Sequence, residues 1–170
     1  MKKYLFITII LGSIFTGQAS FAQRSGAGLS TSMQTTGSSI QLPVWLGDKA
    51  QLAPAIGFTW AEKLGTDLQL GLVARFYSKS EGFSPYVGVS AGVASFFPYE
   101  EGETTIETEA YHDLIFGLNF GAEYFFGENF SIGVEAQGNF TVSDEVSWRF
   151  GNPGGTNFNL ASALRASVYF

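Results

Sequence analysis

The stretch that decides the fold is Leu114-Ile115-Phe116-Gly117-Leu118-Asn119-Phe120-Gly121-Ala122-Glu123-Tyr124. Almost every second residue in it is large and apolar or aromatic, and the positions between include Gly, Asn and Glu. A period of two places alternate side chains on opposite faces of a β-strand. The stretch therefore predicts a strand with one apolar face and one small or polar face.

The same alternation recurs along the chain and predicts an all-β protein. The eight expected strands cover residues 26–34, 40–47, 51–60, 67–76, 86–94, 114–124, 131–140 and 158–170. Pro43 and Pro54 fall inside two of them. Because proline has no backbone N–H for the ladder, each should mark an edge, a bulge or a strand end.

Composition narrows the function classes. The 170 residues are one domain's worth of chain, with only 14 % charged residues and no Cys. Disulfide scaffolds, thiolate zinc sites and Cys nucleophiles are thereby excluded. We expect no cofactor and no metal site.

The N-terminus predicts export. Lys2 and Lys3 precede an apolar run, Tyr4–Phe15, and Ser20-Phe21-Ala22 offers small residues for a signal peptidase. We expect residues 1–22 to be a cleaved secretory signal peptide and 23–170 to be the folded domain; an uncleaved anchor helix would want about 20 apolar residues. Without the two lysines, 7 basic residues face 15 acidic ones, a net charge of −8. Such a chain is a poor nucleic-acid partner.

Connection lengths favour a membrane barrel over a soluble sandwich. If the chain starts in the periplasm, the long breaks 96–110 and 142–156 both fall outside, and the tight turns 47–49 and 126–129 both fall inside. Short periplasmic turns and longer external loops are typical of outer-membrane barrels. The predicted fold is an eight-stranded antiparallel up-and-down transmembrane β-barrel in the cell outer membrane.

In such a barrel the apolar face contacts lipid and the polar face fills the lumen, the inverse of a soluble barrel. Frequent Gly on the polar face suits a narrow lumen. We expect aromatic belts at the two membrane interfaces. The expected belt residues are Trp60, Phe76, Tyr77, Phe96, Phe97, Tyr111, Tyr124, Phe125, Phe126, Phe130, Phe140, Phe158, Tyr169 and Phe170.

Two motifs carry a resemblance to a known family. The alternating Leu164, Ala166, Val168 and Phe170 at the C-terminus resemble the signal read by the outer-membrane barrel assembly machinery. Pro43 and the run Ser84–Val93, which has the form Pro-Tyr-x-Gly-x-x-x-Gly, resemble the small outer membrane protein beta-barrel domain family, related to outer membrane proteins A and X and porin-like. The resemblance implies eight antiparallel strands inserted from the periplasm, and no particular activity.

Charges on the polar face predict a lumen network. An eight-stranded barrel is just wide enough to be filled by side chains, and charges removed from water must be paired. Counting from the strand ends makes Glu135 and Arg165 lumen neighbours, with Glu123 and Arg75 nearby. The network is either a fixed filling or a plug that rearranges to pass ions.

Catalytic signals are sparse. The single His, His112, is followed by Asp113, and no His-x-Ser arrangement occurs, although a Ser on an adjacent strand would still serve as its partner. Lipid A deacylase barrels, which this size class resembles, need such a pair. We expect no catalytic residues.

The long loops carry the remaining candidates. The acidic run Glu100–Glu109 has no EF-hand spacing, so it is either a loose binder of divalent cations or, the favoured interpretation, a solvated loop kept extended by its like charges. Trp148 and Phe150, beside a Gly-rich turn, are a candidate recognition patch or anchors between loops.

We expect a non-enzymatic barrel acting in envelope structure or surface interaction through loops 96–110 and 142–156. Its expected partners are outer-membrane lipid, lipopolysaccharide, the assembly machinery and an unidentified surface ligand. The first alternative is a narrow gated channel, and the second is a lipid-modifying enzyme.

Overall fold

The computed structural model describes residues 26–34, 37–99 and 109–170. The expected signal peptide and most of the acidic run lie outside these residues. The strands are β1 (Gly28–Gln34), β2 (Gly37–Gln41), β3 (Val44–Trp45), β4 (Ala50–Ala61), β5 (Gly65–Tyr77), β6 (Gly82–Pro98), β7 (Tyr111–Phe126), β8 (Phe130–Val142) and β9 (Thr156–Tyr169). The described residues contain no helix that is long and apolar enough to cross a membrane.

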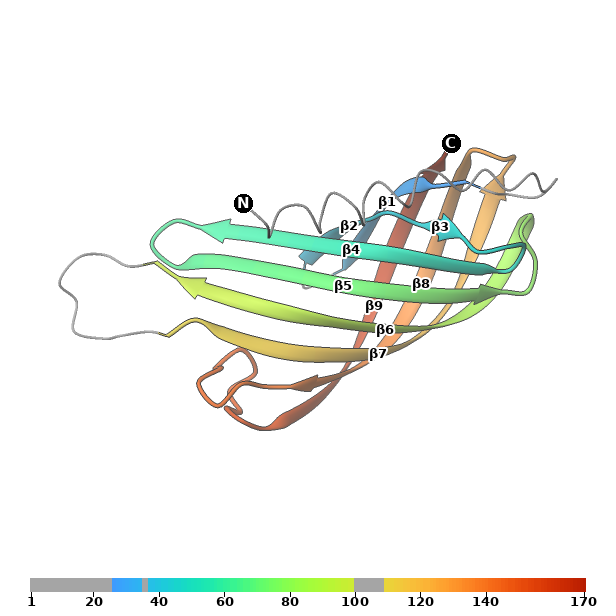
Figure 1. Ribbon diagram of the computed structural model, residues 1–170. Coiled ribbons are helices and arrows are strands. Elements are labelled where there is room, and N and C mark those ends of the chain that lie inside the picture. The colour runs from blue at the N-terminus through green and yellow to red at the C-terminus, as the bar shows by residue number, and fades with distance from the viewer. Residues whose placement is uncertain (1–25, 35–36, 100–108) are drawn as a thin grey trace, which may run out of the picture.

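The strands close into one antiparallel barrel (Figure 1). Apart from β2 and β3, strands adjacent in sequence pair with each other; β1 pairs with β9 to complete the circle, and β2 and β3 both pair with β4. The β2 and β3 strands form one wall segment, interrupted at Leu42 and Pro43. The predicted eight-stranded barrel is confirmed, and Pro43 marks a strand end as expected.

The β6 and β7 strands are longer than the alternation predicts. Phe96 and Pro98 belong to β6, and Phe96 pairs in register with Tyr111 at the start of β7. The alternation of apolar and polar residues is lost at this end of the two strands, but the backbone hydrogen bonds between β6 and β7 continue. The connecting loop is therefore shorter than the expected break 96–110.

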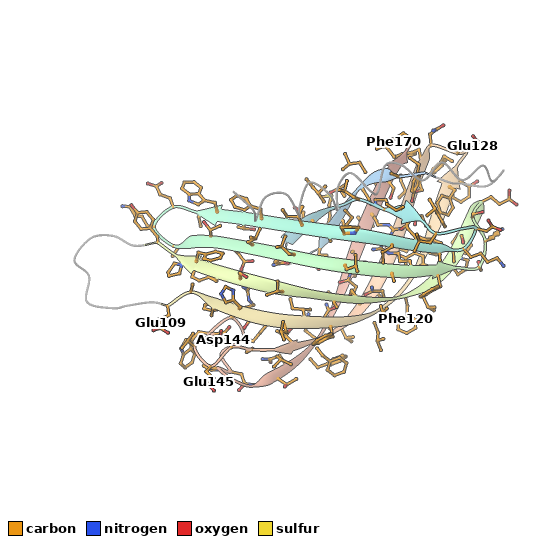
Figure 2. All side chains as sticks on the ribbon, viewed as in Figure 1. Glu109, Phe120, Glu128, Asp144, Glu145 and Phe170 are labelled. Atoms are coloured by element: carbon orange, nitrogen blue, oxygen red, sulfur yellow. The ribbon has the colours of Figure 1, made fainter. Side chains whose placement is uncertain are left out.

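The barrel has its apolar side chains outside and its polar side chains inside. In β7, Leu118 and Phe120 are exposed, while the intervening Asn119 is almost fully buried. Figure 2 shows Phe120 projecting from the outside of the wall. Arg75, Gln51, Glu123 and Asn119 are the largest fully buried side chains. This inverse of a soluble core is the arrangement that lipid requires.

The belt prediction is wrong for three aromatic residues. Tyr77, Phe125 and Tyr169 are buried in the lumen, each on the inward-pointing parity of its strand. They were expected at the membrane interfaces only because they lie close to strand ends. Parity decides the face, because successive side chains of a strand point to opposite sides.

The barrel has two unlike ends. The terminal end holds Gly28, Tyr169 and the connections 46–49, 78–81 and 127–129. The loop end holds the connections 62–64 and 143–155. Figure 2 shows Glu128 and Phe170 at the terminal end and Glu109, Asp144 and Glu145 at the other.

Candidate functional site

An aromatic layer fills the lumen at the terminal end. Trp45, Tyr77, Tyr86, Phe125 and Tyr169 form one buried cluster. Ring centroids lie 5.0 Å apart for Trp45 and Tyr77 and 4.9 Å apart for Tyr77 and Tyr86. Rings at such spacings pack with the density of a protein core. The layer therefore occupies the cross-section of the barrel at this end.

Next to the aromatic layer lies the first buried ion pair. The Arg75 Nε donates to Glu135 Oε2 over 2.8 Å, and both side chains are 1 % exposed. The Tyr86 hydroxyl donates to the same oxygen over 2.8 Å, and Gln137 donates to Glu135 Oε1 over 2.6 Å. Glu135 thus accepts from three donors, as a carboxylate removed from water requires.

A second buried pair joins Arg165 and Glu123. The Tyr77 hydroxyl donates to Glu123 over 2.6 Å and accepts from Arg165 over 2.6 Å. Ser131 and Tyr169 donate to the other Glu123 oxygen. Because Tyr77 and Tyr169 also belong to the aromatic layer, the charges and the rings form one continuous filling.

All four expected lumen charges lie in this filling, but Arg165 pairs with Glu123, and Glu135, expected beside Arg165, pairs with Arg75. Phe130 pairs in register with Val168, so Arg165 lies opposite Gly133 and Glu135 lies opposite Ala163. Counting from the strand ends had placed Arg165 opposite Glu135. The stagger of the ladder, a property of the closed barrel, brings Arg75 to Glu135 instead.

Glycine makes room for these bulky side chains. A Cβ at Gly121 would lie 2.5 Å from the Tyr86 ring and hydroxyl. A Cβ at Gly88 would lie 2.6 Å from the Ala74 carbonyl oxygen, and it would be in ordinary contact with the side chains of Arg75 and Asn119 at 3.4 and 3.5 Å. The small residues of the polar face are therefore the spaces into which Tyr86 and Arg75 extend.

At the loop end, Asp113 anchors the loop 143–155. Its carboxylate accepts from the Asp144 N–H over 3.0 Å, from the Ser147 hydroxyl over 3.0 Å and from Arg149 Nε over 2.8 Å. Arg149 Nη1 reaches Asp67 on β5 over 2.5 Å. The loop is thereby tied across the mouth of the barrel to two strands that are distant in sequence.

The electrostatics of this anchor favour the ionised form of Arg149. Burial by itself would lower the pKa of Arg149, but the hydrogen bonds with Asp113 and Asp67 outweigh it and raise the pKa above its usual value. This cluster was not predicted from the sequence. Arg149 is the only basic residue between Val142 and Thr156, and that was the available signal for an ion pair with the strands.

The two candidate recognition residues sit on the anchored loop. The Trp148 side chain is 72 % exposed and that of Phe150 is 42 % exposed. Ser147 and Arg149, which flank Trp148, are both held by Asp113. The loop therefore presents Trp148 from a fixed backbone.

His112 has a serine partner on the adjacent strand. Its Nδ1 lies 2.9 Å from Ser95 Oγ, and its ring lies edge-on to Phe97. In the described chain, no carboxylate hydrogen-bonds to the His112 ring, and the neighbouring Asp144 binds its backbone N–H instead. The pair lacks the acidic residue that orients the base in a catalytic triad.

Metal ligation has no support in the residues described. They contain no group of three or more His, Asp or Glu side chains placed to hold an ion.

Comparison with known proteins places the fold. The N-terminal β-barrel domain of Pseudomonas aeruginosa OprF superposes with a TM-score of 0.54 at 15 % identity, covering 85 % of this chain and 96 % of that one. This chain has the fold of the small outer-membrane barrels. Neisserial surface protein A superposes with a TM-score of 0.50 at 14 % identity, covering 85 % and 94 % of the two chains. No family model and no curated protein sequence matches the chain.

Proposed function

We propose that this outer-membrane barrel is a non-enzymatic, non-conducting protein of the cell outer membrane that presents a preorganised surface loop. Its terminal end points to the periplasm and its loop end outward. The observation that carries the proposal is the anchor at Asp113, which fixes the loop 143–155 and leaves Trp148 exposed. An exposed aromatic on a rigid scaffold is a common recognition element.

The filling of the lumen at the terminal end supports the non-conducting role. The aromatic layer and the two ion pairs lie in series along the barrel axis and share Tyr77 and Tyr169. Passage of an ion would require both layers to move together. We expect lipopolysaccharide to surround the loop end.

The outward side chains of Leu164, Ala166, Val168 and Phe170 line the terminal end of β9. We propose that they engage the assembly machinery during insertion.

Cells producing the double variant Trp148→Ala and Phe150→Ala test the surface role. We expect reduced adhesion or increased detergent sensitivity, with unchanged amounts of folded protein. The matched control is Phe126→Ala, an exposed aromatic at the terminal end. Adhesion and envelope integrity equal to those of the unaltered protein would contradict a role for the loop.

A gated channel is the second candidate, and one observation favours it. Arg75 Nη1 and Nη2 and Arg165 Nε are buried without a hydrogen-bond partner. The guanidinium groups therefore have spare donors with which to exchange partners. Single-channel recordings of the unaltered protein and of Glu135→Gln distinguish the sealed barrel from the gated channel. Silence in both fits the sealed barrel; discrete openings that change in the variant would assign function to the lumen charges.

The lipid-modifying alternative is tested with His112→Ala. We expect the acyl composition of lipid A to be the same in cells producing the unaltered protein and the variant, because no carboxylate among the described residues hydrogen-bonds to the His112 ring of the Ser95–His112 pair. A difference that depends on His112 would overturn the non-enzymatic proposal.

A further inference from the structure

The lumen is not filled along its whole length. Between the ion pairs and the loop end lies a cavity of about 150 Å³, bounded on one side by the backbones of Gly71 and Gly92, which are paired in register. The polar side chains that line it are Gln34, Ser39, Gln41, Gln69, Ser90, Gln137 and Asn139. All of them are neutral amides or hydroxyls, so the cavity offers many hydrogen bonds and no charge.

One lining group has no hydrogen-bond partner among the described residues. The Gln41 side chain is 4 % exposed, and its Oε1 accepts no hydrogen bond from residues 26–34, 37–99 or 109–170. A buried carbonyl oxygen without a partner destabilises the folded state, because it has lost its hydrogen bonds to water. The cavity therefore has an acceptor that requires a donor from water or from a bound molecule.

The cavity reaches the outside of the barrel through a gap in the wall. The β2 strand pairs with β4 only from Ser39 to Gln41, and β1 pairs with β9 only from Ala163 onward. In the described chain, residues 58–61 of β4 and 156–162 of β9 continue past this short hairpin without a partner on that side. Figure 1 shows β4 extending well beyond β2.

Exposure confirms that the wall is open here. Thr59 has the inward parity of β4, yet its side chain is exposed. A smaller pocket lined by Thr59, Gln69 and Ser39 connects the gap with the larger cavity, because the two share Gln69 and Ser39. We call this opening between β4 and β9 the lateral notch.

The outer rim of the lateral notch is apolar. Phe58 and Trp60 on β4 are 65 % and 62 % exposed, and Leu160 on β9 is 78 % exposed. Apolar side chains in these outward positions contact acyl chains in a membrane. An unpaired strand edge in hydrocarbon is costly, since its backbone groups have no water to bind. The notch thus joins a polar interior to an apolar exterior at one edge.

We propose that the lateral notch and its cavity bind one membrane amphiphile with an uncharged, polyhydroxyl head group. The head group enters the cavity and donates to Gln41, while its acyl chain lies against Phe58, Trp60 and Leu160. The lining of the larger cavity carries no cation to bind a phosphate head group, and the charged residue in the lining of the smaller pocket is the acidic Asp67, which pairs with Arg149. The cavity fits a head group of about the size of a glycerol or a single sugar.

Nuclear magnetic resonance of the side-chain amides tests this site in phosphocholine micelles. Octyl glucoside is expected to cause saturable shifts at Gln69 and Gln137. Methyl glucoside, which has the head group without the chain, should bind at least 10-fold more weakly, and so should octyl phosphocholine, which has the chain with a charged head group. Equal binding of methyl glucoside would make the site one for free sugars and overturn the amphiphile.

Two variants locate the binding. Ala55 lines the cavity on β4, so Ala55→Phe should abolish the saturable shifts. Ala136→Phe places the same ring on the outer face of β8 and should leave them unchanged. Gln41→Leu keeps the side-chain volume but removes the unpartnered acceptor, and should weaken binding about 10-fold. Shifts that do not saturate, or that persist in both Ala55→Phe and Gln41→Leu, would refute the site.

Discussion

The four lumen charges illustrate what a single residue needs in this protein. An ion moved from water into a protein interior loses several kcal/mol of solvation, which only a close partner restores. Glu135 meets this need with Arg75, Tyr86 and Gln137. The alternation of polar and apolar residues along each strand predicted which charged side chains would lie in the lumen. Their partners could not be predicted, because they depend on the stagger between strands.

Replacing Glu135 by Gln should destabilise the folded barrel by about 3–5 kcal/mol, since it leaves the Arg75 guanidinium buried without its counter-charge. Urea unfolding in lipid vesicles, followed by tryptophan fluorescence, measures the change. Glu145→Gln is the control, because Glu145 lies exposed on the loop 143–155. An unfolding midpoint equal to that of the control would contradict a structural role for the ion pair.

The Gly121 position makes a second residue-scale prediction. Gly121→Ala sets a methyl group against the Tyr86 ring and the Val134 carbonyl oxygen, each 2.5 Å away, and overpacking of this kind typically costs about 1–3 kcal/mol. We expect a lower yield of folded barrel in refolding assays. Gly138→Ala, whose Cβ would meet only side-chain atoms at 3.4 Å or more, should fold normally. Equal yields would show that Tyr86 moves aside without cost.

The element that most concerns function is the loop 143–155. Loops usually vary in conformation because few contacts hold them. This loop is held by buried Asp113, which lies on β7 and accepts from three of its residues. The length and composition of the segment predicted a surface loop with exposed aromatics. The anchor depends on a strand about thirty residues earlier and appears only in the tertiary structure.

Asp113→Asn should loosen the loop, because it removes the charge that holds Arg149. Charged hydrogen bonds contribute about 1.5–3 kcal/mol each, so the open form should increase about 10-fold or more. Trypsin cleavage after Arg149 reports this opening when closing is faster than cleavage. Lys63, on the exposed turn 62–64, is the internal reference, and Asp48→Asn at the terminal end is the control. Unchanged cleavage after Arg149 would contradict the anchor.

At the scale of the whole molecule, the barrel is turned inside out relative to a soluble protein. Its outer face is covered by apolar side chains, and its interior holds the arginines and glutamates. The alternation in each strand predicts two unlike faces, and the connection lengths favour lipid on the apolar one. The lateral notch could not be predicted, because it arises where a short hairpin stands between two longer strands.

Leu118→Arg tests this arrangement. Leu118 lies midway along β7 on the outer face, and arginine at the midplane of a bilayer costs about 2–4 kcal/mol on a lipid-facing strand. We expect this loss of unfolding free energy in vesicles. Leu46→Arg, on an exposed turn at the terminal end, should change it by less than about 1 kcal/mol. A small effect at Leu118 would place the hydrocarbon elsewhere on the barrel.

The sequence by itself determined the strands, their two faces and the set of charges in the lumen, because a period of two is a local property of the backbone and needs no knowledge of neighbours. Closure of the barrel decided the rest. It set the stagger that pairs Arg75 with Glu135 and Arg165 with Glu123. It also brought Asp113 into contact with the loop 143–155 and left the lateral notch open. These contacts join residues far apart in sequence, so only the closed ladder determines them.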